Sequence, residues 1–480
     1  MARFKVPLVI RGRIIEEDDI EFGSRHGGAR YSTPDVSRYL DALPLRLPSA
    51  IADLYALNFD DIIAFLDRLA PRLTLHNPHL KLAYELSVES SGLSADILRA
   101  TYDNLGSFFE ASYARQHADI LIGIPFLDGW VDIRKDHGYL ASVRAFGARA
   151  VHIVAGNSPA VCAISLMRNF ITRSDAIVKT PSNDPLTAFA IARTMIDMAP
   201  DHPITRHLSV AYWKGGDESI ESVLYQPRNI EKLVAWGGLA SVQHVLKYVQ
   251  PGIDLITLDP KISVSIIGAE AFSSPSVMAD AAFRAAVDVG AYNQETCVNA
   301  RVIYVQTGSD QAGLIKAEQL GKLIFDEMQR LPNWLSTPAR AIGGALAEEL
   351  EGLKFAAGNV RVIGGDVRGG VVISENAEPV EFSHLLANRV VNLVPVESLE
   401  EAIEAANAYT QTIGIYPDSL MPLLRDQLAF HGAQRFVTLG YATRRVVAGP
   451  SDGIEPARRM CKWILQEKYD SDIQPVLSPL

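Results

Sequence analysis

The feature that most constrains the fold is a regular alternation of short apolar runs with amphipathic segments between residues 150 and 258. Strand followed by helix followed by strand builds parallel βαβ units. We therefore expect an open, mostly parallel sheet with helices on both faces, and such sheets bind ligands at the carboxyl ends of their strands. The expected strands are 150–154, 176–179, 207–212, 232–236 and 255–258, and the expected helices are 160–172, 185–198, 218–225 and 241–249.

A second α/β block follows from about residue 261 to residue 440, with strands and helices in the same alternation. Before the first block, residues 51–118 carry apolar side chains at helical spacing, with Ser94 as a helix cap. We expect a helical N-terminal region joined to a Rossmann-like domain over 1–257, a second α/β domain over 258–440 and a C-terminal interface segment over 441–480.

Composition excludes several classes of protein. A net charge of −11 argues against a broad nucleic-acid surface, which needs clustered positive charge. The three cysteines, Cys162, Cys297 and Cys461, have neither a disulfide pattern nor zinc-site spacing, so we expect reduced thiols, a cytoplasmic protein and no metal. The first nineteen residues resemble strands rather than a signal peptide, and no run of about 18 apolar residues predicts a membrane span.

The segment AYNQETCVNARVIYV carries the strongest chemical signal. A predicted helix ends near Tyr292, a polar turn presents Cys297, and a strand starts at Arg301. A thiol on such a turn is reachable by substrate, and local backbone N–H groups favour its thiolate, which is the nucleophilic form. The alternative is a buried, inert cysteine, which is the commoner fate of a lone cysteine.

Two other strand ends carry candidate polar groups. In VHIVAGNSPAV, Asn157 follows a strand and precedes a helix that starts near Pro159. Its amide could donate to a developing oxyanion, although Asn157 or Ser158 as a simple helix cap is the alternative. In AIVKTPSNDP, Lys179 ends a strand and could meet a ribose or phosphate, and the alternative is a solvated lysine.

A glycine pair follows the predicted strand 232–236. Gly237 and Gly238 stand between that strand and the next helix, so bare backbone could approach a pyrophosphate at a helix N-terminus. A single glycine pair is weak evidence, and the chain has no GxGxxG motif.

The order of these motifs resembles the aldehyde dehydrogenase superfamily over about residues 131–418. That resemblance implies the superfamily's roles for the matching residues. Asn157 would help form the oxyanion hole, Lys179 would bind the adenosine ribose, Gly237 would lie at the pyrophosphate, and Cys297, within NQxxC, would be the nucleophile.

A closer resemblance, to the LuxC-type acyl-CoA reductases, rests on the segments KTPSNDP, NQETCVNARVIYV and DGIEPARRMCKWI. It implies reduction of a fatty or other hydrophobic acyl-CoA to the aldehyde, with NADPH or NADH, and an acyl-protein synthetase as a partner. In the superfamily a hairpin before the Asn–Pro strand mediates oligomerisation. Residues 131–133 and 139–143 match it, and the tail around Trp463 is expected nearby, so we expect a homo-oligomer.

Two positions depart from ordinary aldehyde dehydrogenases. Thr257 stands where those enzymes carry a water-activating glutamate, although a gap in the alignment could place Asp259 there. A missing base suits a reductase, because hydrolysis would waste the acyl group. Ser182 replaces a carboxylate three residues after Lys179, which favours NADPH, with Lys179 and Arg173 as partners of its 2′-phosphate.

Three alternatives stay open at this stage. An acyl-phosphate reductase would also lack the base, and its polar substrate would need several basic side chains near Cys297. A hydrolysing dehydrogenase would use Asp259 as its base. A non-catalytic subunit of a multienzyme complex would need none of these residues.

Overall fold

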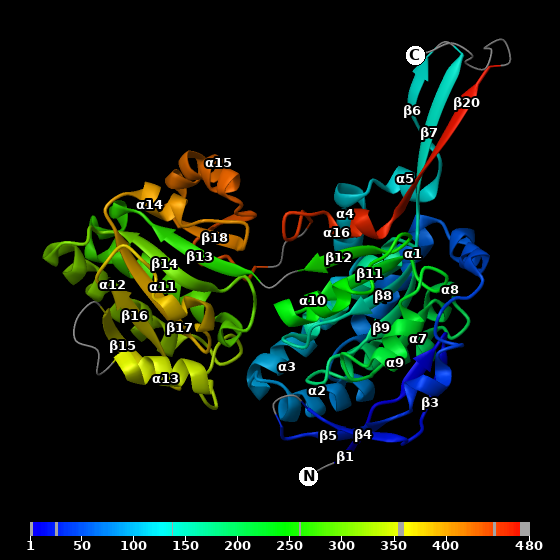
Figure 1. Ribbon diagram of the computed structural model, residues 1–480, viewed down its shortest axis with the longest axis horizontal. Coiled ribbons are helices and arrows are strands. Elements are labelled where there is room, and N and C mark those ends of the chain that lie inside the picture. The colour runs from blue at the N-terminus through cyan, green and yellow to red at the C-terminus, as the bar shows by residue number, and fades with distance from the viewer. Residues whose placement is uncertain are drawn as a thin grey trace. The chain divides into compact units, whose positions relative to one another are not determined.

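The computed structural model describes residues 3–24, 27–136, 138–258, 261–353, 360–444 and 448–470 (Figure 1). The chain divides into two compact units. The first unit is Met1–Ser91, Tyr102–Asp259 and Val446–Leu480, and the second unit is Gly92–Thr101 and Pro260–Arg445. The sequence predicts a separate C-terminal segment over 441–480. From Val446 onward, this segment belongs to the first unit.

The first unit is built on a seven-stranded sheet of order β12-β11-β8-β9-β10-β2-β3. Its parallel strands are β8 (Arg149–Ile153), β9 (Asp175–Lys179), β10 (Leu208–Ala211), β11 (Lys232–Trp236) and β12 (Asp254–Leu258). The helices that follow these strands are α6 (Pro159–Ile171), α7 (Thr187–Met198), α9 (Glu218–Leu224) and α10 (Leu239–Leu246). From β8 the chain moves to β9 and β10, then returns to the other side of β8 as β11. The strand order thus reverses between β8 and β11, which is where open α/β sheets bind ligands.

The N-terminal residues form strands, as their sequence predicts. A hairpin of β2 (Leu8–Ile10) and β3 (Arg13–Ile15) extends the large sheet antiparallel to β10. A separate small sheet has the order β1-β5-β4. Its strands are β1 (Arg3–Lys5), β4 (Ile20–Gly23) and β5 (Arg30–Thr33).

The predicted helical stretch is also present. Its main helices are α1 (Phe59–Leu69), α2 (Pro78–Ser90), α3 (Ala95–Asp103), α4 (Ala111–Leu121) and α5 (Ile124–Asp128). The Ser94 hydroxyl accepts a hydrogen bond from the Ile97 N–H at 3.4 Å, which is the predicted cap of α3.

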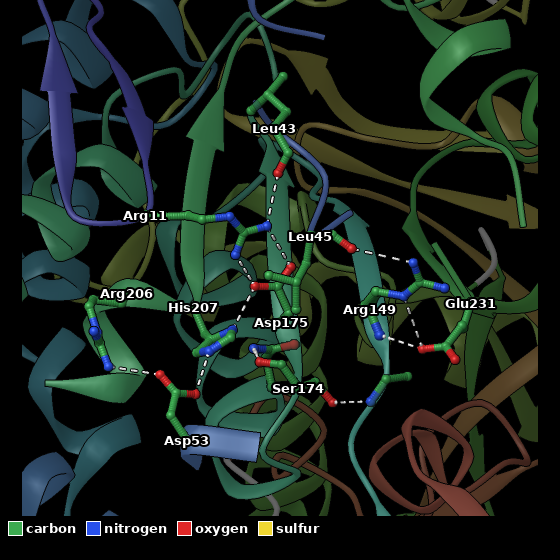
Figure 2. Close-up of polar contacts among 12 residues, drawn as sticks. Arg11, Leu43, Leu45, Asp53, Arg149, Ser174, Asp175, Arg206, His207 and Glu231 are labelled. Atoms are coloured by element: carbon green, nitrogen blue, oxygen red, sulfur yellow. Dashed lines mark hydrogen bonds and ion pairs between the residues drawn. The ribbon is translucent and has the colours of Figure 1, made fainter. Parts of the chain in front are cut away.

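A charged cluster fastens the N-terminal hairpin to the amino-terminal edge of the large sheet (Figure 2). Arg11, in the β2–β3 turn, forms an ion pair with the buried Asp175 at the start of β9. His207 bridges two carboxylates, with Nδ1 2.8 Å from Asp175 and Nε2 2.7 Å from Asp53. Arg206 completes the cluster, 2.8 Å from Asp53. Because Asp175 begins β9 and Lys179 ends it, this cluster lies at the edge opposite the predicted ligand site.

The predicted hairpin before the Asn157 strand is confirmed. It consists of β6 (Val131–Asp136) and β7 (Tyr139–Phe146), and β20 (Lys462–Tyr469) pairs with β7 on its other side. Trp463 lies opposite Ala145 in this ladder, so the tail packs beside the hairpin as expected. The short helix α16 (Pro456–Met460) leads into β20.

The second unit has a seven-stranded sheet of order β15-β16-β17-β14-β13-β18-β19. Its strands are β13 (Ile262–Ile267), β14 (Ala300–Gln306), β15 (Val360–Asp366), β16 (Gly369–Ser374), β17 (Val390–Val396), β18 (Thr410–Tyr416) and β19 (Arg435–Thr438). Its helices are α11 (Pro275–Gly290), α12 (Gln311–Arg330), α13 (Gly344–Leu353), α14 (Leu399–Glu404) and α15 (Met421–His431). Alanines of α11 and apolar residues of α12 pack on this sheet to form a core. Across the described ranges of both units, no helix has the length and apolar character needed to span a membrane.

Candidate active site

The structure places Cys297 on an exposed turn. The turn lies between the short 3-10 helix η6 (Ala291–Gln294), which follows α11, and the start of β14. Cys297 is exposed, whereas Cys162 and Cys461 are buried. Burial raises the pKa of Cys162 well above its usual value and raises that of Cys461 to about 12, so both stay as thiols near neutrality. The alternative of a buried Cys297 is therefore wrong.

Two arginines of the second unit act electrostatically on Cys297. Burial lowers the pKa of Arg301, and the negative charges of Glu295 and of a Cys297 thiolate partly offset that effect. Burial likewise lowers the pKa of Arg435, with Asp288 and Cys297 acting against it. Positive charge near a cysteine favours its thiolate. Sequence reasoning missed Arg435, because it begins β19, more than 100 residues after Cys297, and no local pattern links the two.

The loop that carries Asn157 connects β8 to α6. The Ser158 side chain caps α6 by accepting from the Ala160 N–H at 3.3 Å, and Pro159 is the first helical residue. The capping role that the sequence left open thus belongs to Ser158 and not to Asn157. Asn157 lies at the carboxyl end of β8, one residue before this cap.

Asn183, in the KTPSNDP motif, holds the same loop from the neighbouring strand. Its Nδ2 donates to the Gly156 carbonyl oxygen at 2.8 Å, and Ser90 Oγ donates to the Asn183 carbonyl oxygen at 2.9 Å. A Cβ on Gly156 would lie 2.0 Å from Asn183 Oδ1, so only glycine fits there. The motif therefore ties the turn after Lys179 to the loop of Asn157.

Lys179 is buried at the carboxyl end of β9, with 8% of its surface exposed, so the alternative of a solvated lysine is wrong. Its Nζ lies 5.4 Å from the Trp213 ring centroid. Burial lowers the pKa of Lys179 to about 8, although the nearby Glu221 partly opposes this. Glu221 is itself engaged, because it accepts from Trp213 Nε1 at 3.2 Å and contacts His244. Within the described part of the chain, the Lys179 ammonium has no hydrogen-bond acceptor, which fits an oxygen-rich ligand.

Ser182 lies half-buried in the turn after β9, and its carbonyl oxygen accepts from the Tyr31 hydroxyl at 3.4 Å. Arg173 lies at the other end of that strand. It is buried, donates to the Leu127 carbonyl oxygen at 2.7 Å and pairs with Asp128 at 2.6 Å. The prediction that Arg173 assists Lys179 is therefore wrong, because its guanidinium is consumed by structural contacts at the amino-terminal edge.

The glycine pair stands where a phosphate could approach. Gly237 follows β11, and Gly238 is the N-cap residue of α10, where no side chain caps the helix. A Cβ at Gly238 would meet nothing within 4 Å, so this helix N-terminus opens into space. Because β11 and β8 are adjacent parallel strands, the pair lies at the same sheet edge as the Asn157 loop. Lys179 could therefore contact the ribose of a dinucleotide, and Gly237 and Gly238 could contact its pyrophosphate.

The structure also locates Thr257, one of the two candidate positions for a water-activating base. Thr257 lies in β12, half-buried and opposite Ala235, and Asp259 lies outside the described residues. Two arginines of the DGIEPARRMCKWI segment have structural contacts, because Arg459 pairs with Asp254 at 2.8 Å and the Arg458 guanidinium lies 4.0 Å from the Trp463 ring centroid. No group of three or more His, Cys, Asp or Glu in the described ranges is arranged to hold a metal ion.

Residues 54–463 match the family model described as acyl-CoA reductase (LuxC). The chain belongs to the LuxC acyl-CoA reductase family. Among its relatives is the long-chain acyl-protein thioester reductase of Photorhabdus laumondii, which is 33% identical over 346 residues, or 71% of this chain and 68% of that protein. The enzyme of the same name from Aliivibrio fischeri is 31% identical over 66% of this chain and 64% of its own length. LuxC family membership makes the protein an oxidoreductase, as the sequence predicts.

Solved structures confirm the predicted aldehyde-dehydrogenase-like fold. Aldehyde dehydrogenase 21 from Physcomitrella patens matches 99% of this LuxC chain and 100% of its own, with a TM-score of 0.75 and 13% identity. The NADP-dependent glyceraldehyde-3-phosphate dehydrogenase from Bacillus halodurans, complexed with NADP, matches 97% and 99%, with a TM-score of 0.72 and 15% identity. At such low identities the likeness concerns the fold alone.

Proposed function

We propose that this LuxC family member reduces a long-chain acyl thioester to the aldehyde, with NADPH, through an acyl group carried on Cys297. The observation that carries the proposal is the exposed Cys297 thiol on its turn, under the electrostatic influence of Arg301 and Arg435. The other two cysteines are buried and cannot take this role.

In the proposed reaction the Cys297 thiolate attacks the carbonyl carbon of the thioester. A bond forms between the Cys297 sulfur and the acyl carbon, and the donor thiol leaves. The Asn157 amide and the Cys297 backbone N–H would donate to the oxyanion at each tetrahedral stage. A bound reduced nicotinamide would supply the hydride that the acyl carbon requires. Collapse of the resulting oxyanion breaks the carbon–sulfur bond, releases the aldehyde and restores the Cys297 thiolate.

The acyl donor we propose is a thioester of a thiol carrier. The family description specifies acyl-CoA, and the relatives' names specify an acylated protein. Attack by Cys297 is the same with either donor, because the carrier leaves before reduction. An acyl-protein synthetase is the proposed partner if the carrier is a protein. Comparing long-chain acyl-CoA with the same acyl group on a protein thiol, at equal concentration, identifies the preferred donor.

NADPH is the proposed cofactor because of the groups around Lys179. The buried ammonium would pair with the 2′-phosphate, and the uncapped N-terminus of α10 behind Gly238 would face the pyrophosphate. Ser182 places no carboxylate against that phosphate, and Glu221 is committed to Trp213 and His244. The shared fold supports a nicotinamide dinucleotide, since the Bacillus halodurans enzyme was solved with NADP and a Mycobacterium tuberculosis dehydrogenase of this fold with NAD.

One observation favours a second candidate substrate. Arg301 and Arg435 both interact with Cys297, and cationic groups at a nucleophile also suit an acyl phosphate. Arg435 is partly committed, because it donates to the Ala442 carbonyl oxygen at 2.7 Å. Turnover of a long-chain acyl phosphate at a kcat/KM above that of the matching acyl-CoA would favour this second candidate.

We also propose a homo-oligomer, assembled through the three-stranded sheet of β6, β7 and β20. Ile133 and Leu465 on its outer strands are 55% and 54% exposed, which is unusual for large apolar side chains on strands. Light scattering at micromolar concentration should give at least the mass of a dimer. A monomer mass that is independent of concentration would contradict the proposal.

The reaction class is tested with a panel of acyl-CoA chain lengths and both reduced nicotinamides. The proposal expects consumption of NADPH together with formation of aldehyde, and loss of both after alkylation of Cys297 by iodoacetamide. Oxidation of aldehydes to free acid as the faster direction would indicate a hydrolysing dehydrogenase. Failure of every thioester and every acyl phosphate would indicate a non-catalytic subunit.

A further inference from the structure

The turn before the nucleophile has an unusual backbone. Tyr292, Asn293 and Gln294 lie in succession in the left-handed region, with φ values of 52°, 53° and 65°. A non-glycine residue in this region costs about 1–2 kcal/mol, and such residues persist only where the surroundings hold them. A run of three without a glycine therefore requires strong restraints from neighbouring groups.

The Gln294 side chain supplies the largest of these restraints. It is 1% exposed, and its amide makes three hydrogen bonds. Nε2 donates to the carbonyl oxygens of Ala300 at 2.8 Å and Val390 at 3.0 Å, and Oε1 accepts from the Val390 N–H at 3.0 Å. Ala300 begins β14 and Val390 begins β17, which is the adjacent strand. One amide thus fastens the turn to two strands of the sheet.

The neighbouring residue adds a second restraint. Asn293 Oδ1 accepts from the Thr337 N–H at 2.8 Å, and Asn293 Nδ2 donates to the Thr337 hydroxyl at 3.1 Å. The Tyr292 N–H donates to the Leu335 carbonyl oxygen at 2.7 Å. The left-handed turn is therefore held on one side by the 335–337 segment and on the other by the sheet.

The turn is also fixed on the far side of the nucleophile. Asn299 Oδ1 accepts from the N–H of Thr296 at 3.1 Å and from its hydroxyl at 2.6 Å. Ser263 Oγ, on β13, donates to the Cys297 carbonyl oxygen at 2.7 Å. Cys297 is therefore an exposed thiol on a backbone whose two ends are both immobilised by buried polar groups.

We propose that Gln294 is a positioning residue for the Cys297 nucleophile. Its amide offsets the strain of the left-handed turn and keeps the thiolate in line for attack on the acyl carbon. Gln294 touches neither substrate nor sulfur in this role. The inference rests on the proposed function of Cys297, and it matters because a misplacement of about 1 Å costs roughly 100-fold in rate.

Asn392 provides a matched control. Like Gln294, Asn392 is a buried amide, and it lies on β17. Three of its hydrogen bonds are 3.1 Å or shorter. Nδ2 donates to the Val372 carbonyl oxygen at 2.8 Å and to Ser374 Oγ at 3.1 Å, and Oδ1 accepts from the Val380 N–H at 2.9 Å. None of these partners belongs to the nucleophile turn. Gln294→Ala and Asn392→Ala should therefore destabilise the second unit to a similar extent.

The test compares the two variants in the full-length protein, at a temperature where circular dichroism shows both to be folded. The readouts are single-turnover acylation of Cys297 by a long-chain acyl-CoA, and its alkylation by iodoacetamide from pH 6 to about 9. The label reports Cys297 because the other two thiols are buried with raised pKa values. Gln294→Ala should acylate at least about tenfold more slowly than Asn392→Ala and show a displaced alkylation profile, with NADPH affinity unchanged.

Equal acylation rates and equal alkylation profiles in the two variants would overturn the proposal. If Gln294→Ala does not fold, Gln294→Met keeps the length of the side chain, removes its three hydrogen bonds and should also acylate at least about tenfold more slowly than Asn392→Ala. A wild-type rate in that variant would equally overturn it. Acylation of a Cys297→Ala protein would refute the proposed function instead, and the alkylation comparison keeps the two failures apart because it needs no substrate.

Discussion

Adding one methyl group to Gly156 should disturb the loop of Asn157, and the structure gives the size of the effect. A Cβ at Gly156 would lie 2.0 Å from Asn183 Oδ1 and 2.6 Å from its Cγ. Asn183 would have to move and give up its 2.8 Å hydrogen bond to the Gly156 carbonyl oxygen. Overpacking costs about 1–3 kcal/mol and the lost bond about 1 kcal/mol, so Gly156→Ala should destabilise the first unit by roughly 2–4 kcal/mol.

Activity should fall further than stability suggests. Asn157 follows Gly156 directly, and removing one oxyanion donor costs roughly 100- to 1000-fold in turnover. Asn183→Ala should also destabilise the protein, by about 1–3 kcal/mol, because it leaves the Gly156 carbonyl without its donor. In the double variant the clash is absent, so the two effects should not add, and the coupling energy should be at least about 1 kcal/mol.

The assay is a double-mutant cycle on four proteins: wild type, each single variant and the double variant. Urea unfolding gives the free energies, and steady-state reduction of acyl-CoA gives the turnover numbers. Additive free energies would show that Asn183 does not restrain Gly156. A wild-type turnover number for Gly156→Ala would show that the loop position is irrelevant to catalysis, and either result would refute the reasoning.

Three further predictions concern charge. Burial lowers the pKa of Lys179 to about 8, so the Kd for NADPH should rise about tenfold per pH unit above pH 8. In Lys179→Met the Kd should not depend on pH in this way, and a Kd independent of pH in wild type would contradict the prediction. Ser182→Glu should lower the ratio of kcat/KM for NADPH to that for NADH, and an unchanged ratio would count against the assigned phosphate site. Burial favours the neutral form of Asp175, but hydrogen bonds from His207 and Arg11 together hold its pKa below the usual value. The stability it provides is therefore present above about pH 4 and lost as pH falls through the lowered pKa. Asp175→Asn should lower the free energy of unfolding, measured with urea, by about 3–5 kcal/mol at pH 7 and by less in acid. A variant as stable as wild type at pH 7 would contradict this prediction.

The order of strands and helices could be read from the sequence because buried parallel strands are continuous apolar runs. The run 232–236 is β11 to the residue, and the run 150–154 is β8 shifted by one position. Cys297 was found for a related reason, since its turn interrupts the apolar pattern between α11 and β14. Lys179 and the glycine pair were found because strand ends are marked by a change from apolar to polar residues.

What escaped the sequence depends on contacts between distant segments. Arg173 is near Lys179 in sequence but at the opposite end of β9, and only the structure shows its pairing with Asp128. The left-handed turn at 292–294 has no glycine to announce it, because the restraint comes from Val390 and Thr337. Likewise no local pattern assigns residues 92–101 to the second unit, since that assignment reflects tertiary packing.

The most direct test of the central claim is the fate of an acyl group on Cys297 in the absence of cofactor. Wild-type protein incubated with long-chain acyl-CoA labelled in the acyl group should carry the label on the Cys297 peptide, identified by mass spectrometry. Because Thr257 stands where a water-activating glutamate is expected, the label should be released as free acid only slowly, and NADPH should discharge it as aldehyde. Cys297→Ala should carry no label. Labelling of Cys297→Ala, or prompt release of free acid by wild type, would contradict the account.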